Sequence, residues 1–107
     1  MHKYLFVLLI SLLAATVSAE REEYRVVLKN HRFSPAELQV PANRLLFLVI
    51  ENKGASAEEF DSLDLHREKI IAAGKTAKIK IGPLKVGSYR FVGAFHPDTA
   101  QGVVIAK

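Results

Sequence analysis

Short runs in which apolar and polar residues alternate recur from residue 20 to the end of the chain, separated by Gly, Pro or Asn. Such alternation places successive side chains on opposite faces of a β-strand, and the spacing typical of an amphipathic helix is scarce. The expected strands cover residues 24–29, 37–40, 44–51, 60–65, 68–71, 77–81, 87–95 and 102–106. Seven or eight short strands with frequent turns predict an all-β fold, a Greek-key sandwich or barrel.

Two segments stand apart from this simple alternation. Residues 45–50 are all apolar, which is typical of a strand covered on both faces or placed centrally in a sandwich, so we expect the core strand here. Residues 55–64 are harder to assign, because 57–59 could begin a helical turn whereas 60–65 alternate like a strand. For this segment we expect a loop followed by a strand.

Residues 1–19 have the three parts of a secretory signal peptide. Lys3 supplies a short basic end, residues 5–15 are almost entirely apolar, and Val17-Ser18-Ala19 offers small residues before a charged run. The apolar stretch is shorter than the roughly 20 residues that a membrane span needs. We therefore expect cleavage after Ala19, a mature domain of residues 20–107, and a location outside the cytoplasm.

Removing residues 1–19 from the 107-residue chain leaves 88, enough for one domain. The chain has no cysteine, and its single methionine is Met1, so disulfides and sulfur-based metal sites are excluded from the mature domain. Its mild positive charge comes largely from the alternating 78–81 segment, which is typical of a solvated sheet face. Clustered basic residues with exposed aromatics, which a nucleic-acid surface needs, are not found.

Carboxylates gather in the middle of the chain, at the positions Glu58, Glu59, Asp61, Asp64 and Glu68. In a strand, Glu59 and Asp61 point to one face while Phe60 points to the other, so their oxygens could share one cation or one proton. Acidic residues two apart are also common on solvated strand faces, and spacing alone leaves both interpretations open.

His96 is the most informative of the histidines. It follows an apolar strand and precedes Pro97, so the backbone leaves the strand there and the imidazole can lie at the rim of the fold. Either a metal ligand or a hydrogen-bonded structural histidine fits this position. His31 and His66 lie in polar connections and are interpreted as surface histidines.

No pattern in the chain indicates a stand-alone enzyme. A Gly-x-Ser-x-Gly elbow, a cysteine nucleophile, a His-Glu-x-x-His helix and a phosphate-binding glycine loop are all missing. If any turnover occurs, we expect it to be oxidation of a metal ion.

Three stretches of the mature chain form a recognisable frame: residues 33–42, the pattern Pro-Leu-x-x-Gly-x-Tyr-x-Phe at 83–91, and the loop that carries His96 before the closing strand. In these stretches the chain resembles bacterial cupredoxin-like domains. The resemblance implies a cupredoxin-like sandwich. A blue-copper site is excluded, since that site needs a cysteine thiolate with two histidines.

Within that group the chain is most similar to the EfeO-type proteins, which accompany iron permeases in the bacterial periplasm. Their Glu-x-Glu pair matches Glu59-Phe60-Asp61, whereas their two cysteines correspond to Phe33 and Gly93 here. In small relatives from ferrous-iron uptake systems, a histidine follows the penultimate strand as His96 does, and Glu68 has an acidic counterpart.

The resemblance implies a metal site formed by Glu59, Asp61, Glu68 and His96. Oxygen and nitrogen donors suit a non-blue Cu(II) or an Fe(III) ion. The expected function is assistance of iron uptake, by copper-dependent oxidation of Fe(II) or by passing iron to a permease, with a periplasmic iron-binding protein as a further partner. The alternative is a metal-free interaction module that docks onto a transporter or a periplasmic partner.

Overall fold

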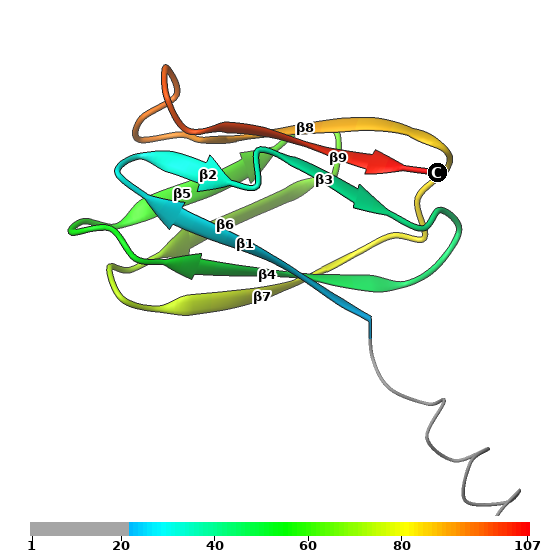
Figure 1. The fold of residues 1–107 in the computed structure, drawn as a ribbon, viewed down its shortest axis with the longest axis horizontal. Helices are drawn as coiled ribbons and strands as arrows, with labels where there is room; N and C mark the ends of the chain where they lie inside the picture. The colour runs from blue at the N-terminus through cyan, green and yellow to red at the C-terminus, as the bar shows by residue number, and fades with distance from the viewer. Residues whose placement is uncertain (1–21) are drawn as a thin grey trace, which may run out of the picture.

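The computed structural model describes residues 22–107, which form two β-sheets packed face to face (Figure 1). One sheet has the strand order β2-β1-β4-β7 and the other has the order β3-β9-β8-β5-β6. The strands are β1 Glu23–Lys29, β2 Arg32–Ser34, β3 Glu37–Val40, β4 Leu46–Asn52, β5 Glu58–Ser62, β6 Arg67–Ile71, β7 Thr76–Ile81, β8 Gly87–Gly93 and β9 Gln101–Ala106. The predicted Greek-key β-sandwich is confirmed, whereas the signal peptide predicted at 1–19 lies outside the described residues.

The described part of the chain has nine strands, where seven or eight were expected. The additional strand is β2, in the segment between the strands expected at 24–29 and 37–40; it pairs antiparallel with β1 and buries Phe33. Strand β5 begins at Glu58, inside the segment expected to be a loop. It ends at Ser62 because the Ser62 hydroxyl accepts the N–H of Leu65 and turns the backbone.

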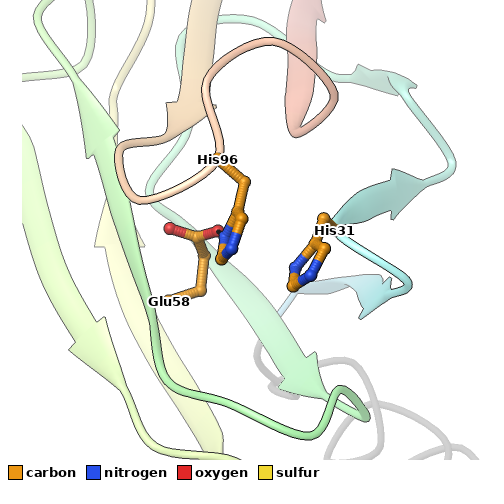
Figure 2. A group of neighbouring side chains, drawn as sticks. All are labelled: His31, Glu58 and His96. Carbon is orange, nitrogen blue, oxygen red and sulfur yellow. Dashed lines mark hydrogen bonds and ion pairs between the residues drawn. The ribbon is translucent and has the colours of Figure 1, made fainter.

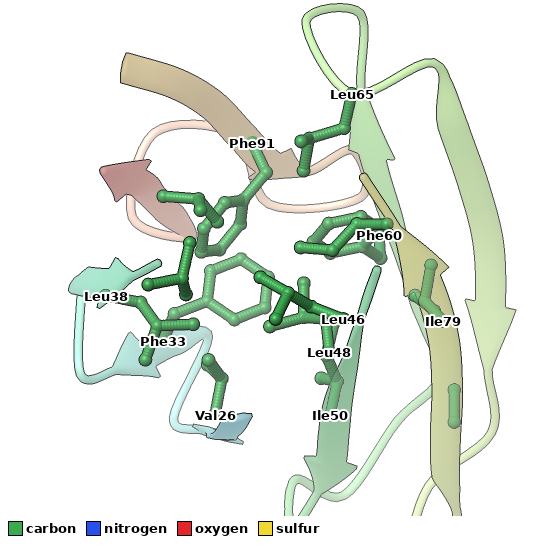
Figure 3. Packing of buried hydrophobic residues seen from close by; sticks show 14 of the residues in the cluster. Val26, Phe33, Leu38, Leu46, Leu48, Ile50, Phe60, Leu65, Ile79 and Phe91 are labelled. Atoms are coloured by element: carbon green, nitrogen blue, oxygen red, sulfur yellow. The ribbon is translucent and has the colours of Figure 1, made fainter. Parts of the chain in front are cut away.

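Three phenylalanines form the centre of the core (Figure 3). Phe33 comes from β2, Phe60 from β5 and Phe91 from β8, and their ring centroids lie 5.0 to 6.4 Å apart. Edge-to-face and tilted contacts at this spacing are the favourable arrangement for aromatic rings. Through these contacts β2 packs against the five-stranded sheet, over the central strand β4.

Strand β4 lies between β1 and β7, and its residues Leu46, Leu48 and Ile50 are completely buried, as the apolar run predicts. On β7 the lysines are exposed and the isoleucines buried, which confirms the solvated face expected for residues 78–81. Residues 22–107 contain no helix that is long and apolar enough to cross a bilayer.

Three connections meet at one end of the sandwich, on the left in Figure 1: the β1–β2 turn, the β4–β5 loop and the β8–β9 loop. They come from parts of the chain that are far apart in sequence. Side chains carried by these connections can therefore form a common site.

Candidate metal centre

His31 lies at the tip of the β1–β2 hairpin. Lys29 pairs with Arg32, so the turn consists of Asn30 and His31 alone, with φ angles of 53° and 57°. Two successive residues in the left-handed region form the turn type that suits the twist of a two-residue hairpin, and Asn and His adopt this region more readily than most residues. The tight turn holds the exposed His31 side chain at the end of the sandwich.

Glu58 is the first residue of β5, and it points to the same face as Phe60. Only 2% of the residue is exposed. Its Oε1 accepts the backbone N–H groups of Glu59 and Phe95, at 2.9 and 2.8 Å. Burial pushes the pKa of Glu58 up, but hydrogen bonds from His96 and from the two N–H groups outweigh it and lower the pKa below 4.5.

His96 projects from the β8–β9 loop, and 34% of its side chain is exposed. The loop is closed by a hydrogen bond from the N–H of Gly93 to the carbonyl of Ala100, and the N–H of Ala100 donates to the carbonyl of His96. The backbone around His96 is therefore fixed. The imidazole lies at the rim of the sandwich, where its Nδ1 is 2.8 Å from Oε2 of Glu58.

The three side chains form one cluster, in which the His96 ring lies between the Glu58 carboxylate and the His31 ring (Figure 2). The two imidazole rings are stacked, with centroids 3.5 Å apart and planes 16° from parallel. One nitrogen or oxygen atom from each residue lies within 4.8 Å of the others. Among residues 22–107 this is the group of potential ligands compact enough to surround one metal ion.

Of the ligand set predicted from the sequence, His96 lies in this cluster and the carboxylates do not. The β5 residues Glu59 and Asp61 point to the face opposite Phe60, as predicted, and Asp61 pairs with Glu68 on β6. The three carboxylates thus share the outward face of the five-stranded sheet. Burial, followed by the charges of Glu68 and Asp61, raises the pKa of Glu59. Metal binding by this outer group stays a prediction.

Sequence patterns alone do not single out His31 and Glu58 as members of the cluster. His31 is exposed, as expected of a surface histidine, and the signal that marks it is its position in a two-residue turn that follows Asn30. Glu58 begins strand β5, in a segment expected to be a loop, although the alternation that sets Phe60 inward also sets Glu58 inward. Because carboxylates are rarely buried, the sequence alone does not suggest that Glu58 faces the interior.

The donors in the cluster do not fit a blue-copper centre, because the chain has no cysteine. Two imidazoles and one carboxylate fit a non-blue site, and these are the donor types used for Cu(II) and for non-haem Fe(II). The cluster lies at a rim and not within the core, so an ion in solution has access to it.

Comparison with protein families agrees with the fold. A model of the cupredoxin-like domain family matches residues 3–106. An uncharacterised protein of Rickettsia prowazekii is 43% identical over 85 residues, which span 79% of this chain and 68% of that protein.

Solved structures of two copper proteins and of a cupredoxin have the same fold. Auracyanin A, a blue copper protein of Chloroflexus aurantiacus, superposes with a TM-score of 0.70 at 13% identity, over 82% of this chain and all of its own. A copper binding protein in its apo form gives 0.69 at 17% identity, over 79% and 86% of the two chains. A purple cupredoxin from Nitrosopumilus maritimus gives 0.62 at 16% identity, over 78% and 98%. At these identities the likeness shows the fold alone.

Proposed function

Because the chain belongs to the family of cupredoxin-like domains, we propose that it is a metal-binding protein whose site is built from His31, Glu58 and His96. The observation that carries this proposal is the convergence of the three side chains at one end of the sandwich. They come from a hairpin turn, a strand and a loop, and each is held by local backbone structure.

The proposed biological role is assistance of iron uptake in the periplasm, following export and removal of residues 1–19. The similarity of the sequence to EfeO-type proteins supports this role, with an iron permease and a periplasmic iron-binding protein as partners. The bound metal is copper or iron. A copper ion held by these residues would supply a one-electron acceptor for Fe(II). In the second route, iron itself is carried to the permease.

The protein's own residues have separate tasks in this function. His31 and His96 offer imidazole nitrogen donors at an accessible rim. Glu58 adds a negative charge, which the lowered pKa keeps in place at neutral pH. That charge is buried beside the imidazoles, so it favours a cation at this end of the molecule.

The proposal is tested by titrating the mature domain, residues 20–107, with Cu(II) and Fe(III) and measuring heat release. His31→Gly and His96→Gln are the informative variants. Glycine suits the left-handed turn at residue 31, and a glutamine amide can still donate to Glu58, so both changes remove an imidazole with little disturbance of the fold.

We expect the unmodified domain to bind one ion, and either variant to bind it at least tenfold more weakly. Glu59→Gln and Asp61→Asn test the ligand set predicted from the sequence. If these two weaken binding while the histidine variants do not, the ion lies on the outer face of the sheet. Binding no tighter than about millimolar in the unmodified domain contradicts metal binding altogether.

A metal-free interaction module is the competing function. Hydrogen bonds join Glu58 to His96 and to the backbone, which is also what a purely structural network would show. Partner capture from a periplasmic extract distinguishes the two functions. Capture that is unchanged by a chelator and by His96→Gln favours the interaction module, and capture that needs the metal favours the proposed site.

A further inference from the structure

Both carboxylate oxygens of Glu58 are already engaged within the protein. Oε1 accepts two backbone N–H groups and Oε2 lies 2.8 Å from Nδ1 of His96. The side chain is 3% exposed. Among the described residues, no buried side-chain nitrogen or oxygen lacks a hydrogen-bond partner. Oε1 therefore has both lone pairs occupied, and Oε2 is buried and already engaged by the β8–β9 loop, so Glu58 is poorly placed to coordinate an ion.

The contact with Glu58 also fixes the tautomer of His96. An ionised carboxylate only accepts hydrogen bonds, so Nδ1 of His96 must carry the proton that it donates. The lone pair of the neutral ring is then on Nε2. A carboxylate that orients a histidine through its other ring nitrogen is a common arrangement behind metal ligands, and it also makes the ligating nitrogen more basic.

The two stacked rings differ in their freedom to adjust. Their planes are nearly parallel, so the in-plane lone pairs of the two imidazoles cannot both point at one atom as the rings stand. His96 is held by Glu58 and by its loop. His31 is exposed, and within residues 22–107 its ring has no hydrogen-bond partner. His31 is therefore the ring that turns when both imidazoles bind one ion.

We propose that the ion is bound by Nε2 of His96 and by the His31 imidazole, while Glu58 is a positioning residue and not a ligand. This rests on the proposed function and narrows its ligand class. The residues have the composition of the two-histidine, one-carboxylate set of non-haem iron sites, but the carboxylate is buried and already accepts three hydrogen bonds from the protein. A pair of imidazoles without a protein oxygen donor selects Cu(II) over the oxygen-preferring Fe(III).

The first test needs no metal. Nitrogen-15 NMR of the metal-free domain at pH 7.5 distinguishes the two neutral tautomers of each histidine by their ring-nitrogen shifts. We expect His96 to be protonated at Nδ1, and Glu58→Gln to relax this preference. A His96 ring protonated at Nε2 in the unmodified protein contradicts the assignment whether or not the protein binds metal.

The second test is electron paramagnetic resonance of the Cu(II) form, together with affinity measurements. We expect coupling to two imidazole nitrogens in the unmodified domain and to one in His31→Gly. Glu58→Gln should keep both nitrogens and weaken Cu(II) binding by about 10 to 100-fold, the usual effect of changing a residue that orients a ligand. Fe(III) supplied as its citrate complex should bind more weakly than Cu(II).

The failures of the two proposals are separable. If neither the unmodified domain nor any of the variants binds copper, the proposed function is wrong. If copper binds but Glu58→Gln alters the copper spectrum as the loss of a coordinated oxygen would, or if Fe(III) binds as tightly as Cu(II), the site stands and the role given to Glu58 is wrong.

Discussion

Glu58 and Glu59 are neighbours in the chain, yet their acidities shift in opposite directions. Glu58 points inward and receives three hydrogen bonds, which lower its pKa in spite of its burial. Glu59 points outward, where partial burial and then the carboxylates of Glu68 and Asp61 raise its pKa. Strand alternation alone separates the two environments. Glu58 therefore belongs to the cluster with His31 and His96, whereas its neighbour Glu59 belongs to the outer group of carboxylates that the sequence predicts as ligands.

Replacing Glu58 should make the free energy of unfolding less sensitive to a fall in pH. Its folded-state pKa is below the ordinary value of 4.5, so its stabilisation is present above that pH and is lost as the pH falls through the lowered pKa. We expect Glu58→Gln to reduce the free energy of unfolding at pH 7 by about 1 to 3 kcal/mol, because buried donors lose a charged acceptor. Urea unfolding of the metal-free domain at pH 7 and below pH 4 measures this. An equal loss at both pH values contradicts it.

Glu59→Gln should have the opposite effect on stability and make the domain more stable at pH 7. A raised carboxyl pKa means that the folded state binds the proton more tightly than the unfolded chain, so stability declines as the pH rises above 4.5 through the raised pKa. Removing the charge should therefore raise the melting temperature at pH 7 and have little effect below pH 4. Thermal unfolding followed by circular dichroism is the measurement, with Glu37→Gln on strand β3 as an exposed control. A lower melting temperature at pH 7 is the contradicting result.

The sequence predicted part of this site for a clear reason. His96 could be found because it precedes Pro97 just beyond an apolar strand and its position matches a loop of the resembling family, although β8 ends at Gly93 and not at residue 95 as predicted. His31 could not be singled out, because its nearness to His96 depends on how the hairpin folds over the five-stranded sheet. Glu58 could have been found from its even spacing with Phe60, but only if strand β5 had been extended by two residues.

At the scale of elements, the packing of β8 against β5 depends on a residue without a side chain. A Cβ at Gly93 would lie 2.7 Å from Cδ of Glu58 and 2.7 Å from Cβ of Ala100. Neither neighbour has room to move, since Glu58 is buried and Ala100 is fully enclosed. Gly93 thus leaves the space that the Glu58 carboxylate fills.

Gly93→Ala should therefore damage both the fold and the site. We expect a loss of about 1 to 3 kcal/mol in unfolding free energy, as for other overpacked interiors, and weaker Cu(II) binding by the molecules that remain folded. Gly102→Ala is the matched control, because its Cβ would meet the Phe91 ring away from the cluster. It should destabilise the domain without changing copper affinity. Equal effects of the two variants on copper affinity would refute a specific role for Gly93.

Most strands could be predicted from alternation, and the differences have local causes. Strand β3 has the expected bounds, and β7 and β9 each begin one residue earlier. The short strand β2 was missed because three residues before a proline give too little alternation to recognise. The pairing of β2 with β1 depends on tertiary contacts, because the hairpin places Phe33 against the Phe60 and Phe91 rings.

At the scale of the whole molecule, metal binding should stabilise the sandwich as a unit, because the cluster joins both sheets. At a free-metal concentration one hundred times the Kd, the expected gain is about 2.7 kcal/mol. For a domain of this size that corresponds to a rise of about 10 to 20 °C in Tm. Differential scanning calorimetry with Cu(II), before and after adding a chelator, measures the rise and its reversal. A Tm that does not change at saturating copper is incompatible with binding to the folded state alone.

The two histidines and Glu58 are contributed by a turn at residue 31, a strand start at residue 58 and a loop at residue 96, which meet only when both sheets are assembled. An unfolded or partly synthesised chain consequently has no such coordination site, and the ion can be acquired only after folding is complete. If the proposed site binds an ion, the compartment in which the chain folds decides which metal is available to it. For a chain exported in unfolded form, the metal pool of the cytoplasm would have no influence on what the finished protein carries.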